Sequence, residues 1–365
     1  MKWSWKIARI AGIDVFIHST FLILIAWIGF SYWISEHSIY AVFNGIAFII
    51  LLFLFVLLHE LGHAIAARKY GITTKDITLL PIGGLARLER MPKEPKQELI
   101  VALAGPLVNF IFAAIMLGYL FITHNLNGIS NATVTDGTMI QRLAIVNLTL
   151  LLFNILPAFP MDGGRVLRAI LAMRMEYTQA THTAAMVGQG FALIFGLIGL
   201  LTNPFLIFIA LFVWIGASQE SSSVQVQEAI SGIPIKRAML TQFQTLDVNQ
   251  RLSDGVDAIL SGYQHEFPVM RGAEMVGILT RGALIKGLAT DGPTANIASV
   301  MDRSFVTAES DEMLERVSER LQTCHCHTVP IFENQKLVGL VTMDNIGEFL
   351  MVQSALKRKS TSQNA

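Results

Sequence analysis

Long runs of apolar residues alternate with short polar segments over the first 218 residues. About 20 consecutive apolar residues are enough for a helix to cross the hydrocarbon core of a bilayer. Six runs approach this length, at about 16–35, 43–66, 99–123, 142–172, 183–201 and 204–218. The pattern predicts a polytopic α-helical membrane protein with about six transmembrane helices.

The pattern changes after residue 218. A polar stretch that begins at Ser218 is typical of a solvated connector. From about 233, short apolar strands alternate with helical patterns, and a motif recurs after roughly sixty residues: Pro268 and Gly277 in the first copy correspond to Pro330 and Gly339 in the second. Each copy predicts strand, turn, strand and helix. We expect a transmembrane domain at 1–218, a linker at 219–232, a soluble α/β pair at about 233–291 and 298–352, and a disordered tail at 353–365.

Composition agrees with a large membrane part. The chain is 53% hydrophobic and 15% charged, whereas an ordinary globular domain is about 45–50% apolar and about 25% charged. Its 27 basic and 27 acidic residues cancel, so nothing indicates nucleic-acid binding. No small-residue cleavage site follows the first apolar run, which favours an uncleaved membrane anchor over a signal peptide.

Basic residues mark the ends of spans that face the cytoplasm. Three of them, Lys2, Lys6 and Arg9, precede the first span. Between the second and third spans lie Arg68, Lys69, Lys75, Arg87, Arg90, Lys93 and Lys96. Between the third and fourth there is only Arg142. This distribution predicts a multi-pass protein of the cell membrane with both termini in the cytoplasm.

The second apolar run carries an H-E-x-x-H pattern at His59, Glu60 and His63. Two histidines four residues apart project from one face of a helix, so both can bind the same metal ion. Glu60, beside the first histidine, can take a proton from an activated water. Ionisable groups in lipid cost about 2.5–3.5 kcal/mol each on insertion scales. This cost favours a functional role over two core histidines bonded to backbone carbonyls.

The fourth run contains a second cluster of chemical groups. Pro157, Pro160 and the glycine pair beginning at Gly163 break any regular helix there. Asp162 lies at this break and needs a counter-charge, which a zinc ion held by two histidines would supply. Catalytic zinc usually has three protein ligands and one open position. Asp162 is therefore the candidate third ligand, with a helix cap as the alternative. Asn154, nearby, could donate to a developing oxyanion or hold the broken helix together.

Three further features could bear on function. The β-branched stretch at 72–88 predicts short strands around Gly83 and Gly84, whose edge could pair with an extended substrate or only join two helices. Asn109 follows Gly105-Pro106 in the third run; structural hydrogen bonding is its expected role, with substrate contact as the alternative. His18, alone in the first run, is expected in a core or interface.

The two cysteines, Cys324 and Cys326, are too close together in sequence to cross-link distant parts of a fold. This fits a reducing compartment. With the neighbouring histidines they suggest a metal cluster. Alternation along a strand would send the two residue types to opposite faces, so no physiological metal site is expected there.

Together these motifs resemble the site-2 protease family of intramembrane zinc metalloproteases. The resemblance covers roughly residues 1–218 and rests on the H-E-x-x-H pattern, the Gly83-Gly84 loop and the segment from Asn154 to Gly163. It implies one Zn²⁺ per chain in a membrane-embedded site that cleaves transmembrane segments of other proteins. The implied metal ligands are His59, His63 and Asp162, and the implied catalytic residues are Glu60 and Asn154.

The repeat at 233–352 resembles a tandem pair of cystathionine-β-synthase (CBS) domains. Such pairs imply regulation of the attached enzyme by ATP, AMP or another adenosine compound. Thr342 and Asp344 would lie near ribose and phosphate. In the first copy Thr280 is present, but Gly282 occupies the position expected to be acidic, which disfavours a nucleotide there. The alternative is a dimerisation role, and a homodimer through the CBS domains is expected.

Two other functions remain compatible with the pattern. A transporter or channel gated by the soluble pair would also place His, Glu and Asp within the membrane. Glu60 argues against it, because a transporter needs no general base beside metal ligands. A catalytically inactive scaffold is the third reading, and the intact set of ligands argues against that.

Overall fold

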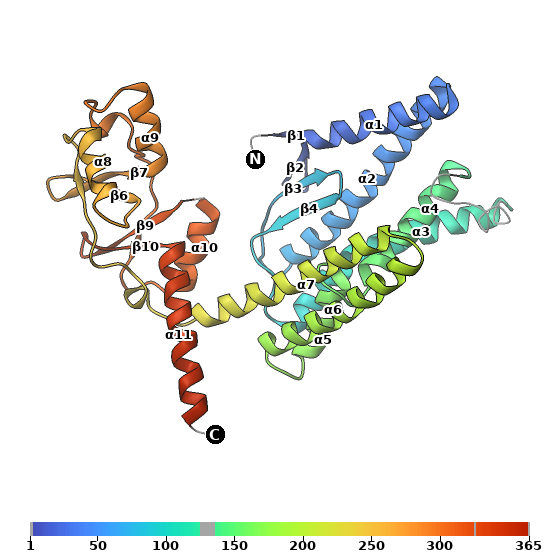
Figure 1. Ribbon diagram of the computed structural model, residues 1–365. Coiled ribbons are helices and arrows are strands. Elements are labelled where there is room, and N and C mark those ends of the chain that lie inside the picture. The colour runs from blue at the N-terminus through green and yellow to red at the C-terminus, as the bar shows by residue number, and fades with distance from the viewer. Residues whose placement is uncertain (1–2, 125–135, 325, 364–365) are drawn as a thin grey trace. The chain divides into compact units, whose positions relative to one another are not determined.

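The computed structural model describes residues 3–124, 136–324 and 326–363, which form two compact units (Figure 1). Unit 1 comprises Met1–Val224 and unit 2 comprises Gln225–Ala365. Unit 1 contains long helices and a four-stranded sheet, whereas unit 2 contains two three-stranded sheets with helices. Each unit is described below by itself.

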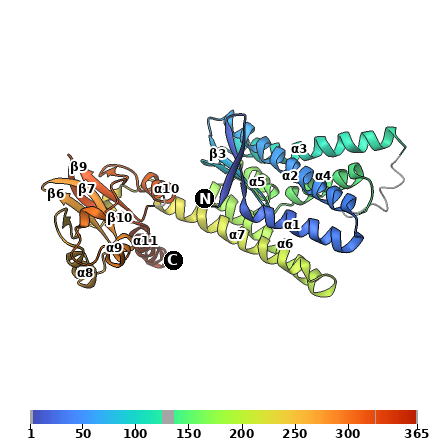
Figure 2. The same ribbon diagram turned by 90° about the horizontal axis from the view of Figure 1, so that it is seen from above.

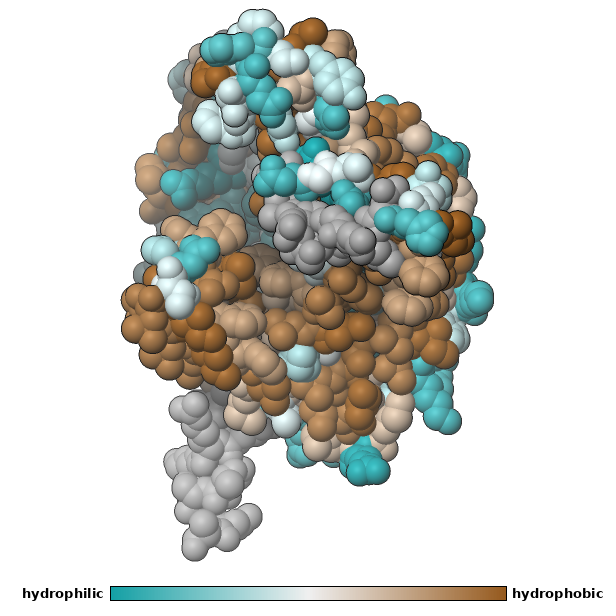
Figure 3. Space-filling model, turned by 90° about the vertical axis from the view of Figure 1, so that its right-hand side faces the viewer, coloured by the Kyte–Doolittle hydropathy of each residue, from teal (hydrophilic) through white to brown (hydrophobic). Residues whose placement is uncertain are grey.

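Unit 1 is built on membrane-spanning helices. Five helices in the described ranges are long and apolar enough to cross a bilayer: α1 (Ser19–Glu36), α2 (Ile39–Arg68), α3 (Pro95–Ile122), α6 (Tyr177–Leu201) and α7 (Phe205–Ile230). Large apolar side chains on them, such as Trp27, Phe121 and Leu197, are exposed. Figure 3 shows apolar side chains covering a large continuous part of the face it displays. Apolar surface of this kind is stable against lipid rather than water.

The fourth expected span is two shorter helices, α4 (Met139–Ile155) and α5 (Asp162–Ala172). The segment 156–161 between them contains Pro157 and Pro160, which cannot continue the hydrogen-bond ladder of a helix. The chain then turns sharply enough that a Cβ at Gly163 would lie 2.2 Å from the carbonyl oxygens of Ile155 and Leu156. Glycine is therefore required at this turn. The polytopic helical architecture is confirmed, with this span divided at the predicted break.

A four-stranded sheet packs against α2, in the order β1 (Ser4–Ile10), β2 (Ile13–His18), β3 (Thr74–Leu80) and β4 (Gly83–Leu88). The β2–β3 pair is parallel and the other two pairs are antiparallel. Strands β3 and β4 were expected from the 72–88 pattern, but β1 and β2 were not. Val15 and Ile77 of the sheet are fully buried in one apolar cluster with Leu57 and Leu61 of α2. Because β4 is an edge strand, one side of its backbone is left unpaired with other strands.

His18, expected in a core or interface, instead caps the first helix. It precedes α1, and its Nδ1 accepts a hydrogen bond from the backbone N–H of Thr20 at 3.3 Å. This bond satisfies one of the N–H groups left free at the start of a helix.

Unit 2 confirms the predicted repeat of strand, turn, strand and helix. The first copy contains β5 (Leu246–Asp247), α8 (Leu252–Leu260), β6 (Glu266–Arg271), β7 (Glu274–Thr280) and α9 (Arg281–Thr290). The second contains β8 (Ala308–Glu309), α10 (Leu314–Cys324), β9 (Thr328–Glu333), β10 (Lys336–Thr342) and α11 (Met343–Gln363). Short 3₁₀ turns lie at Ile235–Arg237 and Ile297–Ser299. Each copy has its own apolar core, and an antiparallel bridge between Leu240 and Leu340 ties the chain before the first copy to the sheet of the second.

Two polar segments are more regular than their composition suggested. Much of the stretch expected as a solvated connector is helical, because α7 is unbroken as far as Ile230 (Figures 1 and 2). Residues 353–363, expected to be disordered, continue helix α11. Ser, Gln, Glu and Lys are all tolerated on exposed helices, so polarity alone does not distinguish such a helix from a coil.

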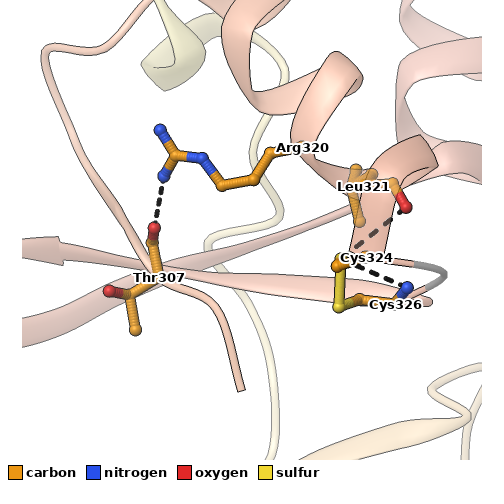
Figure 4. The surroundings of a disulfide bond; sticks show 5 residues. All are labelled: Thr307, Arg320, Leu321, Cys324 and Cys326. Carbon is orange, nitrogen blue, oxygen red and sulfur yellow. Dashed lines mark hydrogen bonds between the residues drawn. A yellow bond between two sulfur atoms is a disulfide. The ribbon is translucent and has the colours of Figure 1, made fainter. Parts of the chain in front are cut away.

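Cys324 and Cys326 form a disulfide at the end of α10 (Figure 4). Their Cα atoms are 5.1 Å apart, within the usual range for a disulfide. This corrects the inference of reduced thiols that was drawn from their spacing. Disulfide sulfurs are not thiolate ligands.

Candidate metal centre

Three side chains meet at one point inside unit 1. His59 and His63 project from one face of α2, and Asp162 projects from the first turn of α5. The two histidine Nε2 atoms are 3.1 Å apart, and each is 3.1 Å from Oδ2 of Asp162. All three residues are buried, with exposed fractions of 5–7%. In the described part of the chain, this is the one group of His, Cys, Asp and Glu side chains close enough to share a metal ion.

The donor atoms fit a zinc ion. A tetrahedron with its centre about 2.0–2.1 Å from each corner has edges of about 3.3 Å, close to the observed 3.1 Å separations. His63 Nδ1 donates a hydrogen bond to the carbonyl of Val101 at 2.7 Å. Since the proton is then on Nδ1, the lone pair of Nε2 points at the other two donors. Three atoms that each direct a lone pair into the same buried space repel one another, and a bound cation removes this repulsion.

Two glycines create the space for this centre. A Cβ at Gly105 of α3 would lie 2.2 Å from His63 Nε2 and 2.7 Å from His59 Nε2. A Cβ at Gly62 of α2 would lie 2.8 Å from the carbonyl oxygen of Ala104. Helices α2 and α3 therefore pack closely where the histidines lie. The sequence pattern identified Gly105 only as a point of close packing or kinking, and its contact with both imidazoles was missed.

Glu60 lies between α2 and the edge strand β4. Its Oε2 accepts a hydrogen bond from the backbone N–H of Ala86 at 3.3 Å. A Cβ at Gly84 would lie 2.7 Å from Cγ of Glu60, so the glycine lets the side chain lie against the strand. Arg87, which follows Ala86 in β4, donates a hydrogen bond to the carboxylate of Asp76 in β3. This contact raises the pKa of Arg87 above its ordinary value. The candidate base and the possible substrate edge are thus in direct contact.

The other predicted residues of unit 1 surround this region. Gly83 begins β4 with a φ of +140°, which favours glycine. Asn154 is half-buried in the last turn of α4, just before the break that leads to Asp162. Asn109 lies one turn after Gly105 in α3 and is 1% exposed. Among the described residues, neither polar atom of its amide has a hydrogen-bond partner, so the structure leaves both of its expected roles open.

The predicted nucleotide residues occupy different places in unit 2. Thr342 and Asp344 line a cavity of about 1010 Å³, together with Gln264 and His265 of the first copy. Thr280 and Gly282 are not among the residues that line it. Thr280 caps α9 instead, accepting a hydrogen bond from the N–H of Ala283 at 3.1 Å. The cavity is thus lined by the junction of β10 and α11 in the second copy, and not by the corresponding junction of β7 and α9 in the first.

A buried His-His-Asp centre, with both histidines on a helix long enough to cross a bilayer, defines a class, the membrane-embedded zinc metalloproteases. Comparison with known proteins supports the same class. The family model "Peptidase family M50" matches residues 47–135 and 129–197, and the CBS domain model matches 297–351. The zinc metalloprotease MJ0392 of Methanocaldococcus jannaschii is 36% identical over 349 residues, which cover 95% of this chain and 96% of the relative. The chain therefore belongs to peptidase family M50, the site-2 proteases, and is a zinc metalloprotease with a C-terminal CBS module.

Two other relatives extend the comparison. Rip3 of Mycobacterium tuberculosis, also named a zinc metalloprotease, is 29% identical over 383 residues, which cover 96% of this chain and 94% of Rip3. The solved structure of a site-2 protease from Methanocaldococcus jannaschii is 40% identical, with a TM-score of 0.43. It covers 60% of this chain and 95% of its own.

Proposed function

We propose that this protein cleaves transmembrane segments of other membrane proteins within the bilayer, by zinc-assisted peptide hydrolysis. The observation that carries the proposal is the convergence of His59, His63 and Asp162 on one buried point, in a unit whose helix α2 and neighbouring helices are long enough to span a membrane. A soluble substrate could not easily reach such a point, whereas a substrate that shares the bilayer approaches from the side. The cytoplasmic location of both termini stays a prediction.

His59, His63 and Asp162 are the residues that would hold the ion. When bound, zinc supplies Lewis-acid chemistry, lowering the pKa of an attacking water to about 7 and polarising the scissile carbonyl. Glu60 takes the proton from that water and passes it to the leaving amine. The amide of Asn154 donates to the oxyanion that develops on the carbonyl. The buried site limits access of bulk water, which strengthens these electrostatic interactions.

Strand β4 is the proposed docking edge for the substrate. A transmembrane helix must unwind before cleavage, because its peptide groups are hydrogen-bonded to one another. An unwound segment could pair with β4 as an added strand beside Gly83 and Gly84, which have no side chains to obstruct it. A carbonyl of that strand could also replace Glu60 as the acceptor for the N–H of Ala86. Substrate pairing would then free the carboxylate for proton transfer.

The test is cleavage in reconstituted vesicles. We expect the full chain to cut a fluorescently labelled single-span substrate, to stop when a zinc chelator is added, and to recover when Zn²⁺ is restored. The alternative, a zinc transporter, predicts zinc flux and no cleavage. Zinc flux into the same vesicles without any cleavage of the substrate would overturn the protease proposal.

We also propose that the cavity in unit 2 binds an adenosine compound such as ATP or AMP, once per chain. Its volume of about 1010 Å³ accommodates a nucleotide, and ligand pockets commonly measure 300–1,000 Å³. Thr342 and the exposed carboxylate of Asp344 offer a hydroxyl and acceptor oxygens for a ribose. The match to the CBS family model at 297–351 covers both residues.

Calorimetry on the full chain with ATP and AMP tests this cavity. We expect about one site per chain and an affinity roughly ten-fold lower in Thr342→Val or Asp344→Asn, because about 1.4 kcal/mol accompanies loss of one good hydrogen bond. Thr280→Val is the matched control, since each threonine caps the helix that follows it and only Thr342 lines the cavity. No heat with either nucleotide would leave dimerisation as the role of the CBS pair.

A further inference from the structure

Arg168 of α5 is the bulkiest fully buried side chain of the described protein, at 1% exposure. Its Nε donates to Oε1 of Glu98 in α3 at 2.8 Å, and its Nη2 lies 2.6 Å from the same oxygen. Its Nη1 donates to Oε1 of Glu220 in α7 at 2.5 Å. The guanidinium also lies 5.0 Å from the ring centres of Phe159 and Tyr177. One side chain therefore joins α5 to α3 and α7.

The residues that make these contacts lie on both sides of Asp162 in the sequence. Phe159 lies three residues before the ligand and Arg168 lies six residues after it, in a helix of only 11 residues. A helix this short has little intrinsic stability, so its position depends on tertiary contacts. Apolar packing alone would not need a buried charge with two carboxylate partners, because such groups are costly to desolvate. Arg168 instead supplies directional bonds, which determine where the first turn of α5, and Asp162 with it, is placed.

Glu220 connects this arrangement to the rest of the chain. It lies on α7, which continues unbroken to Ile230, and residues from Gln225 onward belong to unit 2. Its side chain is 33% exposed, whereas that of Glu98 is fully buried. Arg168 thus has one bond to α3, through Glu98, and one to α7, through Glu220. A movement of α7 could break the bond to Glu220 and leave the packing of α3 intact.

We propose that Arg168 is the positioning residue for the zinc ligand Asp162, and that its bond to Glu220 makes zinc binding sensitive to the position of α7. Movement of α7 that weakens this bond shifts α5 and misplaces Asp162, which lowers zinc affinity. The regulatory part of this inference rests on the proposed binding of a nucleotide to unit 2. The positioning part depends only on contacts within unit 1.

Zinc affinity, measured on the purified full chain by competition with a chelator, tests the positioning role. We expect Arg168→Lys and Glu220→Gln to bind zinc about 10–100-fold more weakly, the range typical when groups that orient a ligand are changed. Cobalt-substituted protein should also show a changed visible spectrum, which reports ligand geometry. The matched control is Arg142→Lys, because Arg142 is another buried arginine, packed 4.0 Å from the ring centre of Phe48 in α2.

Two results would overturn the positioning role. One is wild-type zinc affinity and cobalt spectrum in both variants despite lower thermal stability, which would leave Arg168 with packing alone. The other is an equal loss of zinc in Arg142→Lys. If Arg168→Lys does not fold, Glu220→Gln decides the matter, because it keeps the shape of a partly exposed side chain and removes only its charge.

The link to unit 2 is tested by repeating the zinc measurement with saturating ATP or AMP. We expect the nucleotide that binds to change zinc affinity several-fold in the wild type and not in Glu220→Gln. Equal effects, or none, in both proteins would overturn the coupling. Absence of nucleotide binding would overturn the proposed nucleotide function and the regulation together, and the zinc affinities without nucleotide would still decide the role of Arg168.

Discussion

Replacing Gly105 with alanine is expected to abolish zinc binding. The new Cβ would lie 2.2 Å from His63 Nε2 and 2.7 Å from His59 Nε2, so both imidazoles must move. Helices α2 and α3 are already in close contact at Gly62 and Ala104, so their interface has no spare room for the new methyl group. We expect zinc affinity to fall by more than about 100-fold, beyond the usual effect of changing groups around a metal site. Zinc content after gel filtration, measured by mass spectrometry, checks this.

Gly118→Ala is the control for this substitution. It adds the same methyl group to the same helix, at a position where a Cβ would have no neighbour within 4 Å. This variant should retain one zinc per chain. Full zinc content in Gly105→Ala would show that the three side chains do not form the metal centre, and the proposed mechanism would fail with it.

The parts of this site that local sequence determines could be predicted. His59 and His63 share a helix, so their spacing alone places them on one face. The break around Pro157 and Gly163 is also a local property of the chain, and a carboxylate at such a break pointed to Asp162 as the partner of both imidazoles. The repeat in unit 2 was visible as internal similarity, although a nucleotide at Thr342 and Asp344 stays a prediction.

Most of the contacts that the sequence did not predict join residues that are far apart in the chain. Glu98, Arg168 and Glu220 belong to three different helices, and nothing in their local sequence indicates that they meet. The same is true of the contact between Glu60 and Ala86. Strands β1 and β2 had a local signal in Gly12, which adopts a positive φ in the turn between them. Their positive charges were instead interpreted as the flank of a membrane anchor.

The second large expected effect concerns Glu60. Glutamine has nearly the same shape, can still accept a hydrogen bond from the N–H of Ala86, and still fits against Gly84. It cannot take a proton from water. We therefore expect Glu60→Gln to keep one zinc per chain while its cleavage rate falls by about 10²–10⁴-fold, the usual contribution of a general base. Zinc content and the rate of substrate cleavage in vesicles, measured on the same preparation, check both statements.

The control for charge removal is Glu94→Gln, because Glu94 is an exposed carboxylate just before α3 and makes its contact with Gln97 at the surface. It should cleave at the wild-type rate. If Glu60→Gln also cleaved at that rate, proton transfer would have to be assigned to another group. If it lost zinc together with activity, Glu60 would act by holding α2 against β4. Only retained zinc with lost cleavage separates the chemical role of the carboxylate from its contact with the strand.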